Sequence, residues 1–238
     1  LGYGRDDRRL AALVLQLYES VRCQVDPEAW MQRCEQAYAP ASAPGQTPWG
    51  AYWLARLHEA AHSAAACLRD AIAISGRDAV LAEKYVPLFE KNLAAVSAFQ
   101  TMTDWDAIYA ARAVDFGRLP VVRKTEDPDA KARAAALRKT AISLLRDTLD
   151  AFYGEGATVL ADLAASFLPL QGLLTLVRRF DAAFRQAKRQ RKLLDFSDLE
   201  HETIRLLTDR YTGQPTASAR ELAASFREIL VDEYQDSN

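Results

Sequence analysis

Two adjacent acidic residues, Asp232 and Glu233, directly follow the apolar run at residues 229–231. A short apolar run bounded by polar residues is typical of a buried parallel strand, and nucleotide sites form at the carboxyl ends of such strands. Asp232 would help to hold Mg²⁺ there, while Glu233 would orient or deprotonate the water that attacks ATP. The pattern predicts a Walker B element. The alternative is a strand that runs into an acidic surface turn.

A second candidate site is a concentration of positive charge further upstream. Seven basic residues lie between positions 178 and 192, and Asp181 is the one acidic residue among them. At helical spacing, four of the seven share one face while apolar residues share another. The four are Arg185, Lys188, Arg189 and Lys192. Phosphate contacts from such a face would give affinity without sequence preference, so it is a candidate DNA-binding surface. An ordinary solvated face whose long side chains cover the core is the alternative.

Aromatic and histidine residues near position 55 offer weaker candidates. Trp49, Tyr52 and Trp53 could stack on single-stranded bases, but their spacing equally makes a core stripe, and the alanine-rich sequence after them favours the core. His58 and His62 lie one helical turn apart and could chelate a metal. Because no third ligand stands nearby, we expect surface or hydrogen-bonded histidines instead.

Composition is that of a globular protein of one or two domains, with 50% hydrophobic and 26% charged residues and a net charge of −2 over 238 residues. The three cysteines are widely spaced without a Cys-x-x-Cys pair, which suggests neither a disulfide framework nor a zinc site. No signal peptide is visible and no apolar run reaches the roughly 18 to 20 residues of a membrane span, so we expect a cytoplasmic protein.

Helix signals dominate the elements that must position these sites. Periodicity and helix-start signals predict helices over about 10–21, 27–38, 48–76, 80–100, 103–114, 128–152 and 158–194. Pro169 and Gly172 are expected to divide or bend the last of these. Capping boxes at Ser197 and Ser218 predict two more helices. Residues 116–124 are expected to be extended, and only residues 228–234 have the pattern of a strand. The predicted fold class is mainly α.

The two acidic elements together resemble one family. Residues 194–199 (Leu-Asp-Phe-Ser-Asp-Leu) and 232–236 (Asp-Glu-Tyr-Gln-Asp) are similar, in that order, to paired motifs of superfamily 1 DNA helicases of the UvrD, Rep and PcrA type. The surrounding sequence looks most like the AddA (RexA) helicase–nuclease subunits of bacterial AddAB. Residues 3–7, 17–18 and 26–30 are similar to the start of the inserted 1B region of AddA, as are residues 116–120 midway.

The resemblance implies a division of the chain and a set of partners. Residues 1–193 would form a helical 1B-type insertion, and residues 194–238 would return to a RecA-like 1A motor core that ends in motif II. Gln235 would couple the state of the γ-phosphate of ATP to the DNA-binding elements, while Asp195 and Asp198 would be structural. The parent enzyme would use Mg²⁺ and ATP, act on single-stranded DNA and duplex ends in double-strand break repair and recombination, and pair with an AddB-type subunit.

No Gly-x-x-x-x-Gly-Lys-Ser/Thr motif occurs in the sequence. The backbone nest and the lysine that hold the phosphates of ATP are therefore absent from it. We expect an excised piece of a larger motor that is inactive alone, binds no cofactor and has a poorly anchored carboxyl terminus. A UvrD-like or RecB-like helicase, or a purely structural or protein-interaction module, are the alternative interpretations.

Overall fold

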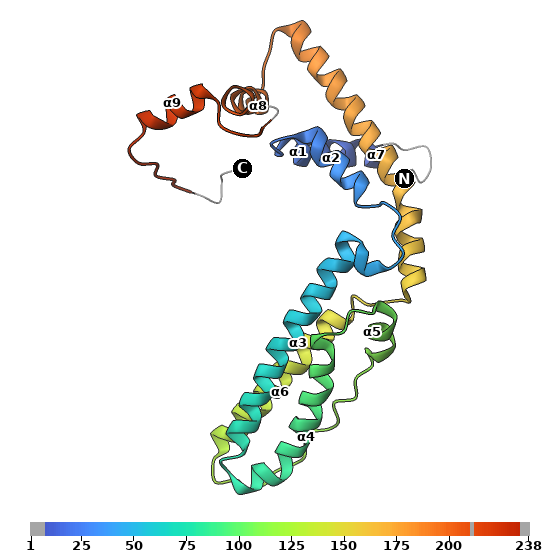
Figure 1. Cartoon of the computed structure of the whole chain (residues 1–238), viewed down its shortest axis with the longest axis vertical. Helices are drawn as coiled ribbons and strands as arrows, with labels where there is room; N and C mark the ends of the chain where they lie inside the picture. Colours follow the sequence, from blue (N-terminus) through green and yellow to red (C-terminus); the bar gives the residue numbers. More distant parts are fainter. Residues whose placement is uncertain (1–7, 210–211, 234–238) are drawn as a thin grey trace. The chain divides into compact units, whose positions relative to one another are not determined.

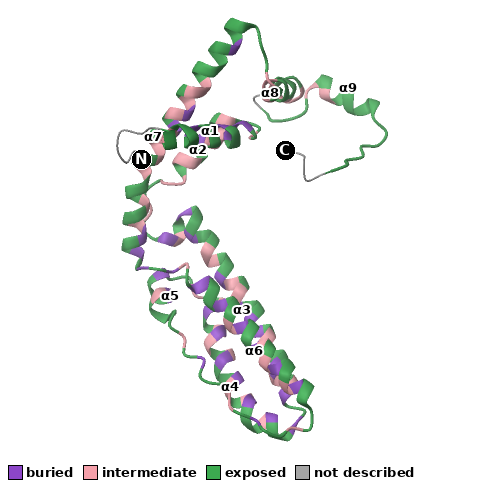
Figure 2. Cartoon of the chain, turned by 180° about the vertical axis from the view of Figure 1, so that it is seen from behind, coloured by how far each residue is buried: buried purple, intermediate pink, exposed green. Residues whose placement is uncertain are grey.

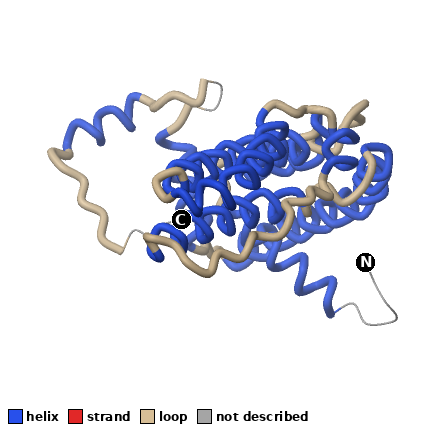
Figure 3. The backbone as a smooth tube through the Cα atoms, turned by 90° about the horizontal axis from the view of Figure 1, so that it is seen from below, coloured by secondary structure: helices blue, strands red, loops and turns tan. Residues whose placement is uncertain are grey.

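The computed structural model describes residues 8–209 and 212–233, and the regular structure in these residues is helical (Figure 3). The mainly α prediction is confirmed. The α-helices are α1 (Arg8–Arg22), α2 (Pro27–Gln36), α3 (Pro48–Ser75), α4 (Ala79–Ser97), α5 (Trp105–Ala111), α6 (Pro128–Leu149), α7 (Gly156–Arg191), α8 (Phe196–Leu207) and α9 (Ala217–Ser225), with short 3₁₀ turns at Pro44–Gln46 and Ala98–Gln100.

The described residues fall into two compact units. Residues 37–165 form one, called here the bundle unit; residues 8–36 and 166–233 form the other, called here the split unit. Helix α7 contributes its first residues to the bundle unit and the remainder to the split unit. The expected boundary at 193/194 was drawn from motifs, and it falls between α7 and α8. It stays a prediction.

The bundle unit is built on α3, α4 and α6, which run side by side (Figure 1). Their facing residues make two buried apolar clusters, one around Leu57, Leu68 and Leu145 and the other around Tyr85 and Phe89. Figure 2 shows this buried surface running along the inner faces of the three helices. The helices begin where the sequence predicts, since Thr47 and Asp127 cap α3 and α6 and a proline follows each cap.

The segment between α5 and α6 is not helical over residues 112–127, as expected for 116–124. A buried polar pair attaches it to the bundle. Asn92 Nδ2 donates to the Phe116 carbonyl at 2.9 Å, and Arg138 donates to the carbonyls of Phe116 and Gly117 at 2.6 and 2.8 Å. Arg138 Nε also donates to Asn92 Oδ1 at 2.9 Å. Backbone carbonyls that no helix satisfies are thus paired by side chains of α4 and α6.

The split unit has a smaller apolar core. Val14, Tyr18 and Val21 of α1 pack with Met31 of α2 and with Leu174 and Val177 of α7. Helices α8 and α9 have no buried residue, and Figure 2 shows them without the buried colour. Their attachment to the remainder of the split unit therefore depends on other contacts.

Helix α7 bears on two expectations. It is one continuous helix from Gly156 to Arg191 with Pro169 inside it, so Pro169 and Gly172 do not divide it, while the bend stays a prediction. By length and composition alone, α7 is also apolar enough to cross a membrane, contrary to the expectation that no stretch qualifies. A single helix of this kind is weak evidence for a membrane span: 11% of its apolar window is buried, and Leu174 and Val177 of α7 pack in the core of the split unit.

The predicted capping boxes are displaced by two residues. Helix α8 is capped by Asp195, whose side chain accepts from the Asp198 N–H at 2.9 Å, and helix α9 is capped by Thr216. Ser197 lies inside the first turn of α8, where its hydroxyl accepts from Arg22 instead. An aspartate directly before the helix outcompetes a serine within it because only the N-cap side chain can reach the free N–H groups.

The predicted strand at 228–234 is wrong for its described part. Residues 228–233 form no strand, and Ile229, Leu230 and Val231 are 79%, 89% and 58% exposed. A strand forms by pairing with another, and no other described segment is extended beside it. The expectation of a poorly anchored carboxyl-terminal segment is confirmed for residues 228–233; Tyr234 lies outside the described residues.

Candidate functional site

Asp232 and Glu233 lie exposed at the end of the apolar run. The Glu233 N–H donates to Asp232 Oδ1 at 2.8 Å, and Glu233 has a positive φ of 48°. This tight turn places two carboxylates next to each other on the surface. Carboxylate oxygens are ligands that suit Mg²⁺, which usually retains several waters and needs one or two protein ligands. The donor chemistry fits the predicted roles, while Gln235 lies outside the described residues.

Arg189 and Lys192 are exposed cations at the basic end of α7. Within the described ranges, neither side chain makes a recorded ion pair or hydrogen bond. Lys192 ends the helix in a left-handed conformation with φ of 56°. Its N–H donates to the Arg189 carbonyl, and the Leu193 N–H donates to the Lys188 carbonyl at 3.0 Å. These two bonds make a Schellman motif with Lys192 at the position where glycine is usual.

A lysine in that conformation is an exception that calls for a reason. Glycine adopts positive φ without steric cost, whereas a residue with a Cβ is strained there by about 1 kcal/mol. The positive charge of Lys192 is favourable beside the carbonyl end of a helix and partly offsets this strain. Its exposed ammonium group is also free to meet an anionic ligand.

The other two predicted DNA-binding residues are already engaged. Arg185 pairs with Asp181 one turn earlier at 3.0 Å and is about half exposed. Lys188 is buried, against the expectation that it faces solvent, and its ammonium group contacts Asp195 at 2.7 Å and Asp198 at 2.5 Å. The Lys188 ammonium nitrogen also lies over the ring of Phe184, 4.6 Å from its centroid. Of the four predicted DNA-binding residues, Arg189 and Lys192 are therefore the exposed ones that make no ion pair in the described ranges, and they form the open part of the basic face.

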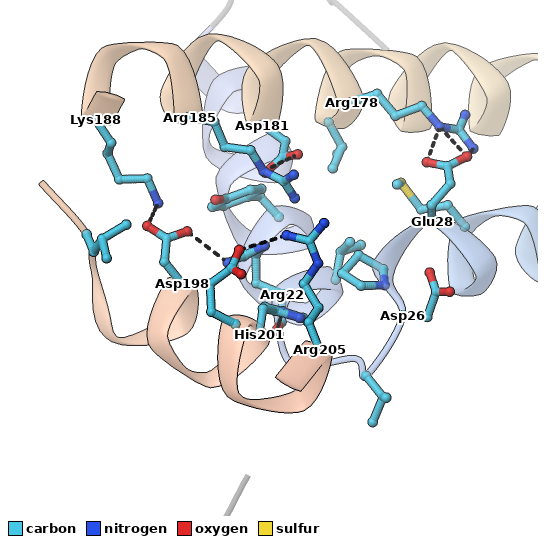
Figure 4. Close-up of a pocket in the computed structure, with 18 of the residues that line it drawn as sticks. Arg22, Asp26, Glu28, Arg178, Asp181, Arg185, Lys188, Asp198, His201 and Arg205 are labelled. Atoms are coloured by element: carbon cyan, nitrogen blue, oxygen red, sulfur yellow. Dashed lines mark hydrogen bonds and ion pairs between the residues drawn. The ribbon is translucent and has the colours of Figure 1, made fainter. Parts of the chain in front are cut away.

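A surface groove of about 670 Å³ lies within the split unit and is lined mainly by charged residues (Figure 4). Along one wall, Arg178 donates to Glu28 at 3.0 Å and to Glu35 at 2.8 Å. Hydrogen bonds to Glu35 and Glu28 raise the pKa of Arg178 above its ordinary value. The guanidinium group is thus a permanent cation that joins α7 to α2.

At the other end of the groove, Arg22 of α1 reaches the start of α8. Its Nε donates to Ser197 Oγ at 3.0 Å, and its terminal nitrogen contacts Asp198 Oδ1 at 3.2 Å. His201 lies beside it, with Nε2 2.9 Å from the Arg22 carbonyl oxygen. Neither Arg22 nor His201 was predicted as a site residue. No short-range spacing reveals this contact, because 175 residues separate Arg22 from Ser197.

In this charge cluster, burial and hydrogen bonding shift the pKa values of Lys188 and Asp195 in opposite directions. Burial alone would lower the pKa of Lys188, but the hydrogen bonds to Asp195 and Asp198 outweigh it and raise the pKa. Burial would likewise raise the pKa of Asp195, but the bond from Lys188, the bond from the Asp198 N–H and the nearby positive charges of Lys188 and Arg22 together lower it. Both groups therefore stay charged near neutral pH, and the cluster carries opposite charges that satisfy one another.

The weaker candidates occupy surface or structural positions. Trp49 and Tyr52 are exposed and only Trp53 packs against the core of the bundle unit, so the predicted core stripe holds for one of the three. His58 Nε2 lies 2.9 Å from the Met102 carbonyl oxygen, and His62 Nδ1 lies 2.8 Å from the His58 carbonyl oxygen. The expectation of hydrogen-bonded histidines is confirmed, and no group of three possible metal ligands occurs in the described part of the chain.

Comparison with known proteins agrees with the two motifs. The family described as UvrD/REP helicase N-terminal domain matches residues 167–238. The AddA protein of Moorella thermoacetica, an ATP-dependent helicase/nuclease component, is 38% identical over 249 residues, which cover 99% of this chain and 17% of that protein. Its counterparts in Heliobacterium modesticaldum and Geobacillus thermodenitrificans are 32% and 33% identical over 100% and 98% of the chain.

Along its whole length, the chain resembles the AddA helicase/nuclease proteins. The chain spans about a fifth or less of the length of these relatives, covering 17% to 20% of each. The UvrD/REP match begins at residue 167, next to the point where the split unit resumes at residue 166. The UvrD/REP match therefore covers the carboxyl-terminal part of the split unit.

Proposed function

We propose that this chain is a segment of an ATP-dependent DNA helicase–nuclease of the AddA type. The observation that carries the proposal is the similarity to an AddA relative over 99% of the chain, joined to a UvrD/REP match that includes Asp232 and Glu233. The parent protein would be cytoplasmic, pair with an AddB-type subunit, and process duplex ends in double-strand break repair and recombination. Residues 1–193 would be its 1B-type insertion and residues 194–238 part of its 1A motor core.

In the parent enzyme, Asp232 would hold Mg²⁺ with its carboxylate and Glu233 would act as the base toward water, with Gln235 beside the γ-phosphate. The exposed carboxylates of Asp232 and Glu233 support these roles, because oxygen donors on a surface turn can accept a hydrated cation. Bound Mg²⁺ would neutralise charge that develops on the transferred phosphoryl group. By itself the chain should release no inorganic phosphate from Mg²⁺-ATP, because its sequence lacks the phosphate-binding loop.

DNA phosphates would bind at the open part of the basic face, which is Arg189 and Lys192 with help from Arg185. Two observations support this assignment. Arg189 and Lys192 are exposed, and Lys192 occupies a glycine-favoured position where its side chain has a steric cost. Lys188 would have a structural role next to this surface and would not bind phosphate itself, since its charge is paired with Asp195 and Asp198. Contacts to phosphate without contacts to bases suit a motor that moves along any sequence.

The test is fluorescence-anisotropy binding of the chain to single-stranded DNA and to blunt duplex DNA across a salt series. We expect binding that weakens with salt, and a double variant, Arg189→Gln with Lys192→Gln, whose log–log salt slope on duplex DNA is smaller by about 2. The matched control is Lys91→Gln with Lys139→Gln, which removes the same charge from exposed positions on α4 and α6. It should keep the slope of the unmodified chain.

Two outcomes would contradict the proposal. One is no binding by the unmodified chain while its circular dichroism shows the helical fold intact. The other is an equal loss in both double variants, which would mean that overall charge and not this surface determines the affinity.

A further inference from the structure

Helix α8 is attached to its neighbours in an unusual way. It is amphipathic, yet none of its residues is buried, and Phe196, Leu199 and Leu206 are 85%, 51% and 67% exposed. Its recorded side-chain contacts to α1 and α7 are instead polar: Lys188 with Asp195 and Asp198, Arg22 with Ser197 and Asp198, and His201 with the Arg22 carbonyl. Apolar burial holds most helices in place, so an attachment made by charge needs an explanation.

Asp198 lies at the centre of these contacts. Its Oδ1 accepts from Arg22 of α1 at 3.2 Å, while its Oδ2 contacts Lys188 of α7 at 2.5 Å and accepts from the Asp195 N–H at 3.2 Å. One carboxylate therefore joins two helices that are distant in sequence and closes the N-terminal cap of α8. Figure 4 shows Lys188 and Arg22 approaching Asp198 from opposite sides.

The cluster is enclosed enough for its charges to matter. The side chains of Arg22, Lys188 and Asp198 are only 8%, 11% and 13% exposed. In such surroundings a charge that loses its partner is strongly disfavoured, because water cannot replace the lost contact. Arg22, Lys188, Asp195 and Asp198 balance as two positive and two negative charges, and Asp195 is the more exposed member at 40%. Removing Arg22, Lys188 or Asp198 would therefore leave an enclosed charge without its partner.

We infer that Lys188 and Arg22 form a polar latch that holds the segment made of α8 and α9 (described residues 195–209 and 212–225) on α1 and α7 and allows α8 and α9 to detach together. Helix α9 belongs to the same segment because Thr216 returns hydrogen bonds to Leu207 and Leu206 at the end of α8. If the proposed function holds, this segment connects the basic end of α7 to Asp232 and Glu233. Arg22 and Lys188 are then positioning residues between the DNA-binding surface and the Walker B element.

The latch has a measurable signature in hydrogen–deuterium exchange. In the unmodified chain, raising salt from about 0.05 M to about 0.5 M should speed the exchange of α8 amides by less than the substitutions do, because Asp195 is 40% exposed and its pair with Lys188 is the one open to screening. The amides of α3 and α6, which are held by apolar burial, should change little over the same range. This experiment uses the unmodified chain, so it tests the polar latch even where a substitution prevents folding.

Substitutions then locate the effect. Lys188→Met and Arg22→Gln should each speed the exchange of α8 and α9 amides by about tenfold or more, with α3 and α6 unchanged. Lys188→Arg should leave the exchange of α8 and α9 amides slow, because arginine keeps the positive charge that pairs with Asp195 and Asp198. Arg189→Gln is the neighbouring control: it should weaken DNA binding and leave α8 exchange as it is.

The inference and the proposed function fail in different ways. Exchange of α8 that is insensitive both to salt and to Lys188→Met would overturn the latch, whatever the DNA-binding result. A latch confirmed by exchange in a chain that does not bind DNA would overturn the DNA-binding surface and leave the latch as a feature of the fold.

Discussion

The bundle unit and the α8–α9 segment are held by different forces. Leu57, Leu68 and Leu145 of the bundle are fully buried between three long helices, whereas α8 and α9 bury no residue. Ion pairs attach the start of α8, and hydrogen bonds of Thr216 join α9 to the end of α8. Apolar burial is non-directional and is spread over many contacts, while an enclosed charge cluster depends on a few specific partners. The comparison teaches that the two regions should respond differently to substitution, and that local opening is expected first where attachment is polar.

Replacing a leucine by alanine in each region gives the largest expected contrast. Leu145→Ala removes a fully buried side chain of α6 and leaves a cavity, so it should lower the free energy of unfolding by about 2–5 kcal/mol. Leu206→Ala in α8 removes a side chain that is 67% exposed and should change that free energy by no more than about 0.5 kcal/mol. Urea unfolding followed by circular dichroism measures both. Equal losses would contradict the contrast.

Acid should destabilise the bundle unit in part through the carboxylate of Asp78. Asp78 caps α4, accepting from the Val80 and Leu81 N–H groups, and it also accepts from Thr125 and from the Glu126 N–H at 2.9 Å. The bond from Thr125, with these backbone bonds, lowers the pKa of Asp78 from 3.8 to about 2. Because the folded-state pKa is depressed, Asp78 contributes stability above about pH 4 that is lost as the pH falls through about 2.

The check is thermal unfolding of the unmodified chain and of Asp78→Asn between pH 5 and pH 2, with the two melting temperatures compared at each pH. The difference between the two proteins should be largest near pH 5 and shrink toward pH 2. A constant difference over this range would show that Asp78 does not titrate as its contacts indicate.

Local sequence rules predicted the helices well and their long-range contacts poorly. Thr47-Pro48 and Asp127-Pro128 identified the starts of α3 and α6, because caps and prolines act within one turn. Lys188 was placed on an open basic face by helical spacing alone, since spacing does not reveal that Asp195 and Asp198 fold back against it. Residues 229–231 have the composition of a strand, but composition supplies no pairing partner.

The same distinction between local and long-range features applies to the residues of the candidate site. The sequence identified Asp232 and Glu233 and the exposed cations Arg189 and Lys192, all of which lie on the surface. It did not identify Arg22, whose contact to Ser197 crosses 175 residues of chain. The left-handed conformation of Lys192 was equally hidden, because lysine at that position is an exception to the preference for glycine.

A small expected effect on stability, that of a substitution at Lys192, is the most informative about function. Lys192→Gly places the preferred residue at the left-handed end of α7 and should raise the free energy of unfolding by about 0.5–1 kcal/mol. Thermal unfolding measures the change, and Arg191→Gly, inside the last helical turn, is the control that should lower stability.

DNA binding by Lys192→Gly tests the central claim most directly, because the substitution separates stability from binding. If the basic end of α7 binds DNA phosphates, the variant should be at least as stable as the unmodified chain yet bind duplex DNA more weakly, with a log–log salt slope smaller by about 1. A stabilised variant that binds DNA with the same affinity and slope would contradict the account and leave Lys192 as a strained residue without a role in binding.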